Sequence, residues 1–460
     1  MRVDALGNKG KRTISLSEDS LEMYLQNVAL KRRGIFFDKD RYEQMITYIN
    51  ILARRSNKIV PVYNRIYNDG YKIVYELDPA SNRCVVVDRE GIKIGNEADV
   101  FFHHSQYYRN QVEPYFDEST DYKELTRLIR KHFNLRHIDD VILFSIYLVS
   151  CFLGTYINHP LLAVSGQKGS GKSSFIKKFC DLVDPKHIEL GSVPRNREDL
   201  ALKISESLVT DFDNMSYLNK DISDLLCRAV TGGVDARRTL YMDKKQTIFD
   251  LKSIIVLDGI QLVIKEDDLL DRTLFFSLSR FKSDELKTEE ELNKEFEKDK
   301  PKILGFCFAL IYLALTDEEP VDRSKTLRMA DFYVWAIRIG RAIGYKESTI
   351  IRVLESNQKE ANYETLMNDV TAQALLNYME YKDAVNMTVT EFYGELKDSA
   401  INLKLDLSKL PKQPNTLSRK LNSIQSNLEE GISFEIKNKG YAKEIRLINA
   451  NAKKVPIEIV

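Results

Sequence analysis

The spacing of apolar residues changes several times along the chain, and each change predicts a different kind of structure. Apolar residues recur at helical spacing in residues 15–55, which we expect to form helices. Residues 59–102 hold short β-prone runs between turn signals, which predict a small antiparallel β unit. Residues 120–157 return to the helical pattern.

In residues 161–275, short apolar runs alternate with helical segments, a pattern typical of an α/β domain with a mainly parallel sheet. Residues 284–385 are helical, and two alternating strands follow helices near the C-terminus. These changes predict six parts: a helical segment (1–58), a β-rich unit (59–115), a helical connector (116–160), an α/β core (161–283), a helical region (284–386) and a C-terminal module (387–460).

Composition narrows the class of protein. The 460 residues include 68 Lys and Arg against 68 Asp and Glu, so a uniformly basic protein that coats nucleic acid is excluded, whereas a locally basic groove is not. The five cysteines are scattered without CxxC spacing, which favours a reducing cytoplasm over a disulfide framework. The N-terminus resembles no signal peptide. The uncharged run at 141–157 is shorter than the roughly 20 residues of a membrane span, and we expect a buried core helix there and no membrane partner.

A phosphate-binding motif follows the first apolar strand of the α/β region. Residues 166–173 read GQKGSGKS and match GxxxxGK[ST]. The glycines allow backbone N–H groups to surround phosphate oxygens, the lysine reaches the β and γ phosphates, and the serine hydroxyl binds Mg²⁺. The N-terminal end of the helix that follows favours the anion. The sequence therefore predicts a site for ATP and Mg²⁺ at Gly166, Gly169, Gly171, Lys172, Ser173 and Ser174.

A second apolar strand ends in acidic residues. Asp211 and Asp213 are two positions apart and could project to one side, as coordination of Mg²⁺ beside a phosphate loop requires. We predict that Asp213 binds the metal and that Asn214 positions the attacking water. Asp211 remains an alternative ligand, and one of the two acids could instead cap the following helix.

Two further elements carry candidate cations. β-prone runs flank residues 243–246 and predict a hairpin with Lys244 and Lys245 at or near its tip. These lysines could contact nucleic-acid phosphates, or the hairpin could be an ordinary solvated one. Arg272 stands at the start of another apolar strand, where it could reach the γ-phosphate of a neighbouring subunit. The alternative is a surface ion pair with Asp268 or Asp271.

The C-terminal module has a modest excess of basic residues. A helix from Pro414 presents Arg419 and Lys420 on faces other than its apolar one, and two alternating strands follow it. Helix, turn, helix and a two-stranded wing describe a winged helix, whose second helix could enter a DNA groove. A protein-interaction module is the alternative.

Taken together, the motifs between residues 166 and 276 resemble the AAA+ helicase module with a hairpin before its sensor 1 strand. This module occurs in superfamily 3 and minichromosome-maintenance-like helicases. The likeness is closer to replication ATPases of mobile elements and prophages, including staphylococcal cassette chromosomes and pathogenicity islands, and covers most of residues 59–460. It is carried by residues 166–173, Asp213-Asn214, residues 226–228 and 231–233, residues 268–272 and residues 328–332.

The resemblance implies an α/β P-loop AAA+ ATPase core with a small β-rich and helical N-terminal region, a helical lid and a C-terminal winged helix. It also implies a homo-hexameric ring that hydrolyses ATP at subunit interfaces and moves 3′ to 5′ on single-stranded DNA. By carry-over, Lys244 and Lys245 lie on the channel hairpin and Arg272 is an arginine finger in trans. Asp258 stands at the sensor 1 position, where the family usually has Asn, and Arg328 is a candidate for sensor 2.

We therefore expect a cytoplasmic, ATP-dependent DNA helicase or translocase for replication of a mobile element, with forked DNA and other replication proteins as partners. One alternative is an origin-binding initiator that uses ATP as a switch, without processive unwinding. Another is an AAA+ remodeller of proteins. Too few residues precede the β unit to hold a primase-polymerase domain, so we expect no primer synthesis.

Overall fold

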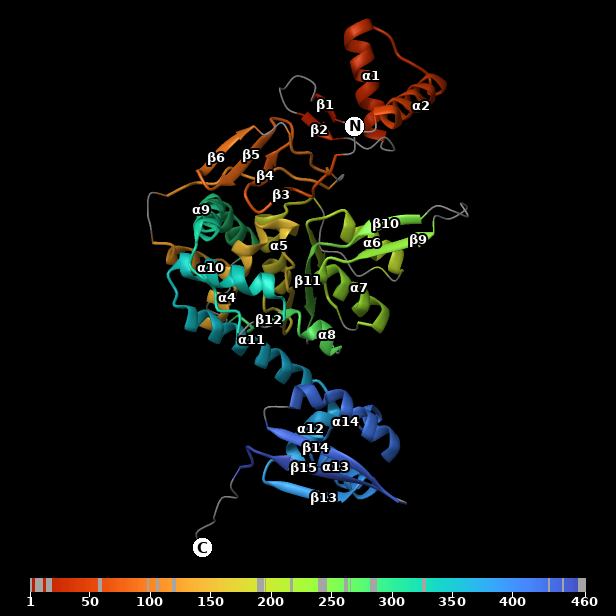
Figure 1. The fold of residues 1–460 in the computed structure, drawn as a ribbon, viewed down its shortest axis with the longest axis vertical. Coiled ribbons are helices and arrows are strands. Elements are labelled where there is room, and N and C mark those ends of the chain that lie inside the picture. Colours follow the sequence, from red (N-terminus) through yellow and green to blue (C-terminus); the bar gives the residue numbers. More distant parts are fainter. Residues whose placement is uncertain are drawn as a thin grey trace.

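The computed structural model describes residues 2–4, 11–13, 19–56, 60–96, 99–104, 107–117, 121–187, 194, 196–215, 218–238, 246–259, 264, 266–281, 288–324, 328–428, 431–440 and 442–453. Figure 1 shows the N-terminal helices at one end of the long axis and a small C-terminal module at the other. A mixed α/β body with a parallel sheet lies between them.

The predicted N-terminal helices are confirmed as α1 (Asp19–Arg33) and α2 (Lys39–Ser56), and a short pair of strands, β1 (Arg2–Asp4) and β2 (Lys11–Thr13), precedes them. The predicted β unit is also confirmed, as an antiparallel sheet in the order β3-β4-β5-β6. Its strands are β3 (Ile66–Asn68), β4 (Ile73–Asp78), β5 (Arg83–Asp88) and β6 (Gly91–Asn96). Tyr75 and Val85 face the main core, whereas Val74 and Val86 form a separate cluster with Phe102. Both faces of this small sheet are therefore covered.

The central sheet is parallel, with the order β12-β7-β11-β8. β7 and β11 are buried throughout, as expected of central strands with helices on both faces. Successive residues of β7 face different clusters: Leu162 and Val164 contribute to the core that includes α4, α5, α9 and α10, whereas Leu161 and Ala163 contribute to the core of α6 and α7. The strands are β7 (Leu161–Gly166), β8 (Val209–Phe212), β11 (Ile254–Gly259) and β12 (Thr273–Leu278).

Some of the helices around the central sheet precede its strands in the sequence, some lie between them and some follow them. They are α3 (Lys123–His132), α4 (Ile138–Cys151), α5 (Lys172–Val183), α6 (Arg197–Ser205), α7 (Lys220–Thr231), α8 (Asp267–Leu270), α9 (Glu289–Thr316), α10 (Ala330–Ile343) and α11 (Glu347–Met367). Every residue from Asp140 to Cys151 in α4 is buried, so the buried core helix expected in the uncharged run is confirmed. None of the helices in the described part of the chain has the length and apolar character of a membrane span.

Asn357 attaches α11 to the edge of the central sheet. Its side-chain oxygen accepts the main-chain N–H of Phe275 at 3.0 Å, and its side-chain nitrogen donates to the carbonyl of the same residue at 2.6 Å. The amide is buried, so these two bonds replace those that a further strand would make with β12.

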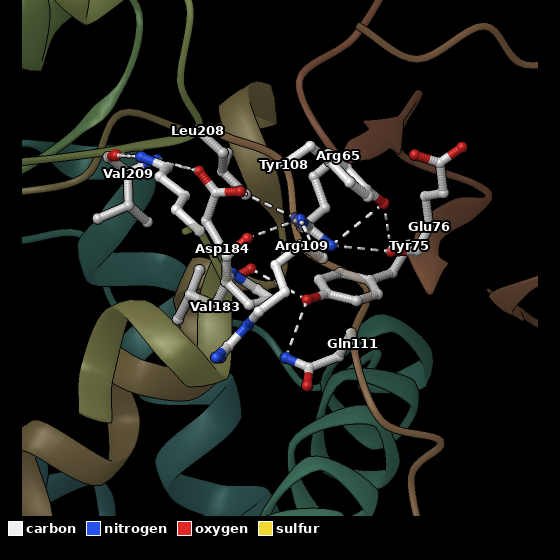
Figure 2. Close-up of polar contacts among 12 residues, drawn as sticks. Arg65, Tyr75, Glu76, Tyr108, Arg109, Gln111, Val183, Asp184, Leu208 and Val209 are labelled. Atoms are coloured by element: carbon white, nitrogen blue, oxygen red, sulfur yellow. Dashed lines mark hydrogen bonds and ion pairs between the residues drawn. The ribbon is translucent and has the colours of Figure 1, made fainter. Parts of the chain in front are cut away.

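Arg65 lies at the centre of the contact between the β unit and the α/β body (Figure 2). Its side chain is 1% exposed, and its Nε donates to the Asp184 carboxylate at 2.9 Å. The same carboxylate accepts the main-chain N–H of Val209 at 3.1 Å. Burial alone would raise the pKa of Asp184, but Lys186 and the Arg65 guanidinium hold it below its usual value. Since Asp184 follows α5 and Val209 begins β8, one ion pair joins the β unit to two elements of the body.

Side chains of the β unit and of the segment after it also cap the C-terminus of α5 (Figure 2). The side-chain amide of Gln111 donates to the carbonyl oxygens of Asp181 at 2.9 Å and Leu182 at 3.0 Å. The Tyr75 hydroxyl donates to the carbonyl of Val183 at 3.1 Å. The last carbonyls of a helix have no partner within the helix, so the β unit and the segment after it supply the caps that α5 needs.

The C-terminal module has its own apolar core and an antiparallel sheet in the order β13-β15-β14. That core includes Leu375 and Met379, so the helix before the predicted boundary at 386/387 contributes to the same unit as the helices after it. The elements are α12 (Val370–Met379), β13 (Ala384–Thr388), α13 (Val389–Asn402), the 3-10 helix η3 (Leu407–Lys409), α14 (Pro414–Leu428), β14 (Ile432–Lys439) and β15 (Ala442–Asn449).

Replacement of the buried arginine should destabilise the protein. Arg65→Met removes the fully buried cation from the Asp184 carboxylate and leaves it Lys186 at 3.3 Å as its charged partner. Loss of a buried partner costs about 3–5 kcal/mol and should lower the urea midpoint measured by circular dichroism. Arg83→Met removes an exposed pair with Glu113 and should leave the midpoint nearly unchanged. Asp184→Asn in the Arg65→Met background should recover part of the loss. Equal shifts for Arg65→Met and Arg83→Met would contradict this role of the buried pair.

Candidate active site

The loop of residues 167–171 connects β7 to α5, and its glycines are structurally required. Gly169 and Gly171 have φ values of +83° and +84°, in the left-handed region that glycine favours. A side chain at Gly166 would lie 2.6 Å from the Leu278 carbonyl, and one at Gly171 would lie 2.9 Å from the Phe281 ring. The loop can therefore follow this path only with glycine at these positions.

Lys172 begins α5 and folds back over the loop. Its Nζ donates to the carbonyl of Gly166 at 2.8 Å. Ser173 is exposed in the same first turn, where the N-terminal end of the helix favours an anion. A cation, a hydroxyl and free helix N–H groups thus meet at the carboxyl edge of the parallel sheet, an arrangement that suits phosphate.

Asn134 holds this loop from outside the motif. It lies between α3 and α4, and its side-chain nitrogen donates to the carbonyls of Ser170 at 3.0 Å and Ser279 at 2.7 Å. Ser279 follows β12, so the amide fastens the loop to the end of the neighbouring strand. Sequence reasoning missed this residue because nothing in its local pattern marks it.

Two acidic side chains meet at the same edge of the sheet. β11 lies between β7 and β8, with Asp258 opposite Val164 and Leu257 opposite Phe212. Asp258 is 2% exposed and accepts the main-chain N–H of Asn214, and its carboxyl group shares a hydrogen bond with Asp213. Burial, together with the Asp213 carboxyl, raises the pKa of Asp258 to about 7, although the Asn214 N–H and Lys172 act in the opposite direction.

Asp211 has different neighbours from Asp213. The Lys203 ammonium donates to the main-chain oxygen of Asp211 at 2.9 Å. Burial lowers the pKa of Lys203, and the nearby Asp211 carboxylate partly offsets that effect. The structure thus joins Asp213 to Asp258 near Lys172, whereas Asp211 lies near a second lysine. Asn214 has a φ of +55°, which turns the chain sharply after Asp213.

Arg272 lies at the amino end of the parallel strands, whereas the loop lies at their carboxyl end. β12 pairs in parallel with β7 along its whole length, so the strand begins near Arg272 and ends beside Gly166. Within this chain the Arg272 guanidinium pairs with the Asp268 carboxylate at 2.5 Å. Arg328 contacts the same carboxylate at 3.1 Å and Asp271 at 2.8 Å. The alternative of a surface ion pair is thus observed in the single chain, and action across an interface remains a prediction.

The predicted hairpin is present as β9 (Val234–Arg238) and β10 (Gln246–Asp250), paired antiparallel. It projects to one side of the body in Figure 1. Lys244 and Lys245 lie outside the described residues. In the C-terminal module, Arg419 is exposed on α14, whereas the neighbouring Lys420 forms an ion pair with Asp369, the N-cap residue of α12.

Two family models match the chain. One, described as an actinomycete integrative conjugative element replication protein, matches residues 126–357, and the other, described as the AICE RepA C-terminal domain, matches residues 371–455. These matches define a replication protein of a mobile genetic element. The chain belongs to the family of actinomycete integrative conjugative element replication proteins.

Solved structures with some similarity include two apo structures of the NrS-1 C-terminal region. One has 10% identity and a TM-score of 0.35 over 80% of this chain and 94% of that one, and the other has 13% identity and a TM-score of 0.37 over 93% and 90%. A ligand-bound JCV helicase has 18% identity and a TM-score of 0.26 over 43% of this chain and 55% of that one. Scores this low do not establish a common fold. No curated protein sequence matches the chain.

The carboxyl pair predicts a pH-dependent stability. Because the folded-state pKa of Asp258 lies above its ordinary value of 3.8, its stabilising proton is fully bound at low pH and is lost as the pH rises through 7. In Asp258→Asn the amide donates to Asp213 at every pH. We expect this variant to gain stability over the native protein from pH 5 to pH 8, by on the order of 2–4 kcal/mol, in urea unfolding.

The matched control is Asp211→Asn, on β8 beside Lys203, which should show no comparable rise over the same pH range. A constant difference between Asp258→Asn and the native protein at pH 5 and pH 8 would contradict the shared proton.

Proposed function

We propose that the chain is an ATP-driven DNA helicase or translocase that replicates its mobile element. The observation that carries this proposal is the loop of residues 166–173 beside the Asp213–Asp258 pair, at one edge of a parallel sheet. A phosphate cradle next to an acidic strand end is the arrangement that hydrolysis of a nucleoside triphosphate requires. We assign the body to the AAA+ class, with α9 to α11 as its helical lid.

Each residue of this site has a role that its position suits. Gly166, Gly169, Gly171 and Ser174 would offer main-chain N–H groups to the phosphates, and Lys172 would leave the Gly166 carbonyl for the β and γ oxygens. Ser173 and Asp213 would hold Mg²⁺, which supplies charge neutralisation on the phosphates when bound. Asp258, at the sensor 1 position, and Asn214 would orient the attacking water.

A second subunit would complete the site. Arg272 is at the amino end of the strands and its own loop is at the carboxyl end, so it cannot contact the phosphates that its own chain would bind. In a homo-hexameric ring it would exchange the Asp268 carboxylate for the γ-phosphate of the neighbouring subunit. Charge stabilisation of this kind is worth about 10³–10⁵ in rate in related systems.

Two elements would contact DNA. The hairpin of β9 and β10 would carry Lys244 and Lys245 to the phosphates of a single strand in the ring. The C-terminal module runs helix, strand, helix, helix, strand, strand, the order of a winged helix, and α14 presents Arg419 to solvent. Forked DNA and other replication proteins would be its partners in the cytoplasm.

A second candidate function is an ATP-switched, origin-binding initiator without processive unwinding. It is favoured by the separate apolar core of the C-terminal module, which lets that module contact DNA as an independent unit.

Hydrolysis and unwinding distinguish these functions. The full chain should hydrolyse ATP faster with single-stranded DNA and displace a strand from a fork with a 3′ tail, whereas Lys172→Ala should abolish both activities. Stimulation without displacement would favour the initiator. No response to DNA would favour a remodeller of proteins and contradict the helicase.

The hairpin lysines should couple hydrolysis to unwinding. The double variant Lys244→Ala and Lys245→Ala should keep the basal ATPase rate and lose strand displacement, since only the phosphate contacts are removed. Lys294→Ala with Lys298→Ala, two exposed lysines on α9, is the matched control and should keep both activities. Intact unwinding in the hairpin variant would overturn this role.

The two basic residues of α14 should differ in their contribution to duplex binding. Arg419→Ala should weaken binding by the full chain and reduce the salt slope by about one, because an exposed arginine loses a phosphate contact. Lys420→Ala should have a smaller effect, because that ammonium is already paired with Asp369. Fluorescence anisotropy at several salt concentrations measures both, and identical slopes for the two variants would count against a DNA-contacting α14.

A further inference from the structure

A groove opens beside the N-terminus of α5 and adjoins the last residue of the loop. It is bounded by residues 130–136 between α3 and α4, by the first turns of α5, by Phe281 and by the start of α9. It encloses about 690 Å³, within the roughly 300–1,000 Å³ of sites that hold small ligands.

The groove is continuous with one end of the phosphate loop. Gly171, Ser173 and Ser174 line it, whereas Asp213 and Asp258 do not. The acidic pair marks the end of the loop where a metal and a water would meet the terminal phosphate. The groove thus reaches the first turn of α5 but not the acidic pair, so it offers the rest of a nucleotide a path away from Asp213 and Asp258.

The groove is lined by charged and aromatic side chains. Its charged residues are Arg130, Lys131, His132, Arg136, Lys177, Lys178 and Glu289. Lys131 is already paired with Asp299, and Lys178 donates to the His132 carbonyl, so the exposed Arg130 and Lys177 are the cations best placed for a ligand.

Phe281 supplies an aromatic surface in this groove. Its ring lies against Gly171, close enough that a Cβ there would come within 2.9 Å of it, and Phe133 and Leu292 add apolar surface nearby. Aromatic rings beside a phosphate site bind bases by stacking, which tolerates any base because each has a π face.

We propose that this groove receives the ribose and base of the nucleoside triphosphate whose phosphates occupy the loop, with Phe281 as the stacking ring. The proposal rests on the nucleotide-binding function above and names the residues that hold the nucleoside. Asn134 is a positioning residue in this arrangement: its two hydrogen bonds fix the loop against the end of β12 and thereby shape the boundary between cradle and groove.

The test compares ATP with inorganic tripolyphosphate, both with Mg²⁺, in calorimetric titrations of the full chain. The native protein should bind ATP more tightly, because only ATP has a part that enters the groove. Phe281→Ala should weaken ATP binding about tenfold, the size of a lost base stack, and leave tripolyphosphate binding unchanged. Phe281→Tyr should retain the affinity for ATP.

Phe116→Ala, a half-exposed phenylalanine outside the groove, is the matched control and should change neither affinity. An equal effect of Phe281→Ala on both ligands, or none on either, would overturn the proposal. It would also be overturned if the native protein bound both ligands equally. Failure of the native protein to bind either ligand would instead overturn the nucleotide-binding function itself.

Asn134→Ala distinguishes an effect on the loop from an effect on the groove. It should weaken ATP and tripolyphosphate alike, because the clamp acts on the phosphate cradle. Asn357→Ala also removes two main-chain hydrogen bonds of β12, but away from the loop, and should weaken neither ligand. An effect of Asn134→Ala on ATP alone would contradict its assignment as a positioning residue.

Discussion

The buried ion pair of Arg65 and Asp184 is the interaction on which the arrangement of this chain depends. It joins residues 119 positions apart, and the buried guanidinium would be left without a carboxylate partner if Asp184 were removed, at a large cost. Because Asp184 also accepts the N–H of Val209, the pair fixes the start of the strand whose far end carries Asp213. The β unit is thus a structural part of the α/β body.

Side chains from outside α5 hold both of its ends. Gln111 and Tyr75 satisfy the carbonyls at its C-terminus, and Asn134 holds the loop that enters its N-terminus. A helix fixed in this way presents Lys172 and Ser173 in a defined position before any ligand arrives. Preorganised donors of this kind strengthen a phosphate site, because little has to reorganise on binding beyond the release of Lys172 from the Gly166 carbonyl.

The parts of the molecule that the sequence predicted are those with local signals. The motif at 166–173, the hairpin and the antiparallel β unit each depend on residues close together in the chain, so their patterns are readable. Arg65, Asn134 and Phe281 act through partners far away in sequence, and nothing nearby marks them. The boundary expected at 386/387 has the same limitation, since β13 joins the C-terminal module by pairing with β15. Lys420 shows that a basic residue on a candidate recognition helix can serve an internal ion pair instead.

The contact between Asn357 and β12 also affects the tendency of the protein to aggregate. β12 is an outer strand of the central sheet, and outer strands offer unpaired N–H and C=O groups to which a strand of another molecule can add. The Asn357 amide occupies both backbone groups of Phe275, and α11 lies over this edge. Asn357 and α11 together therefore protect the β12 edge of the central sheet against edge-to-edge aggregation.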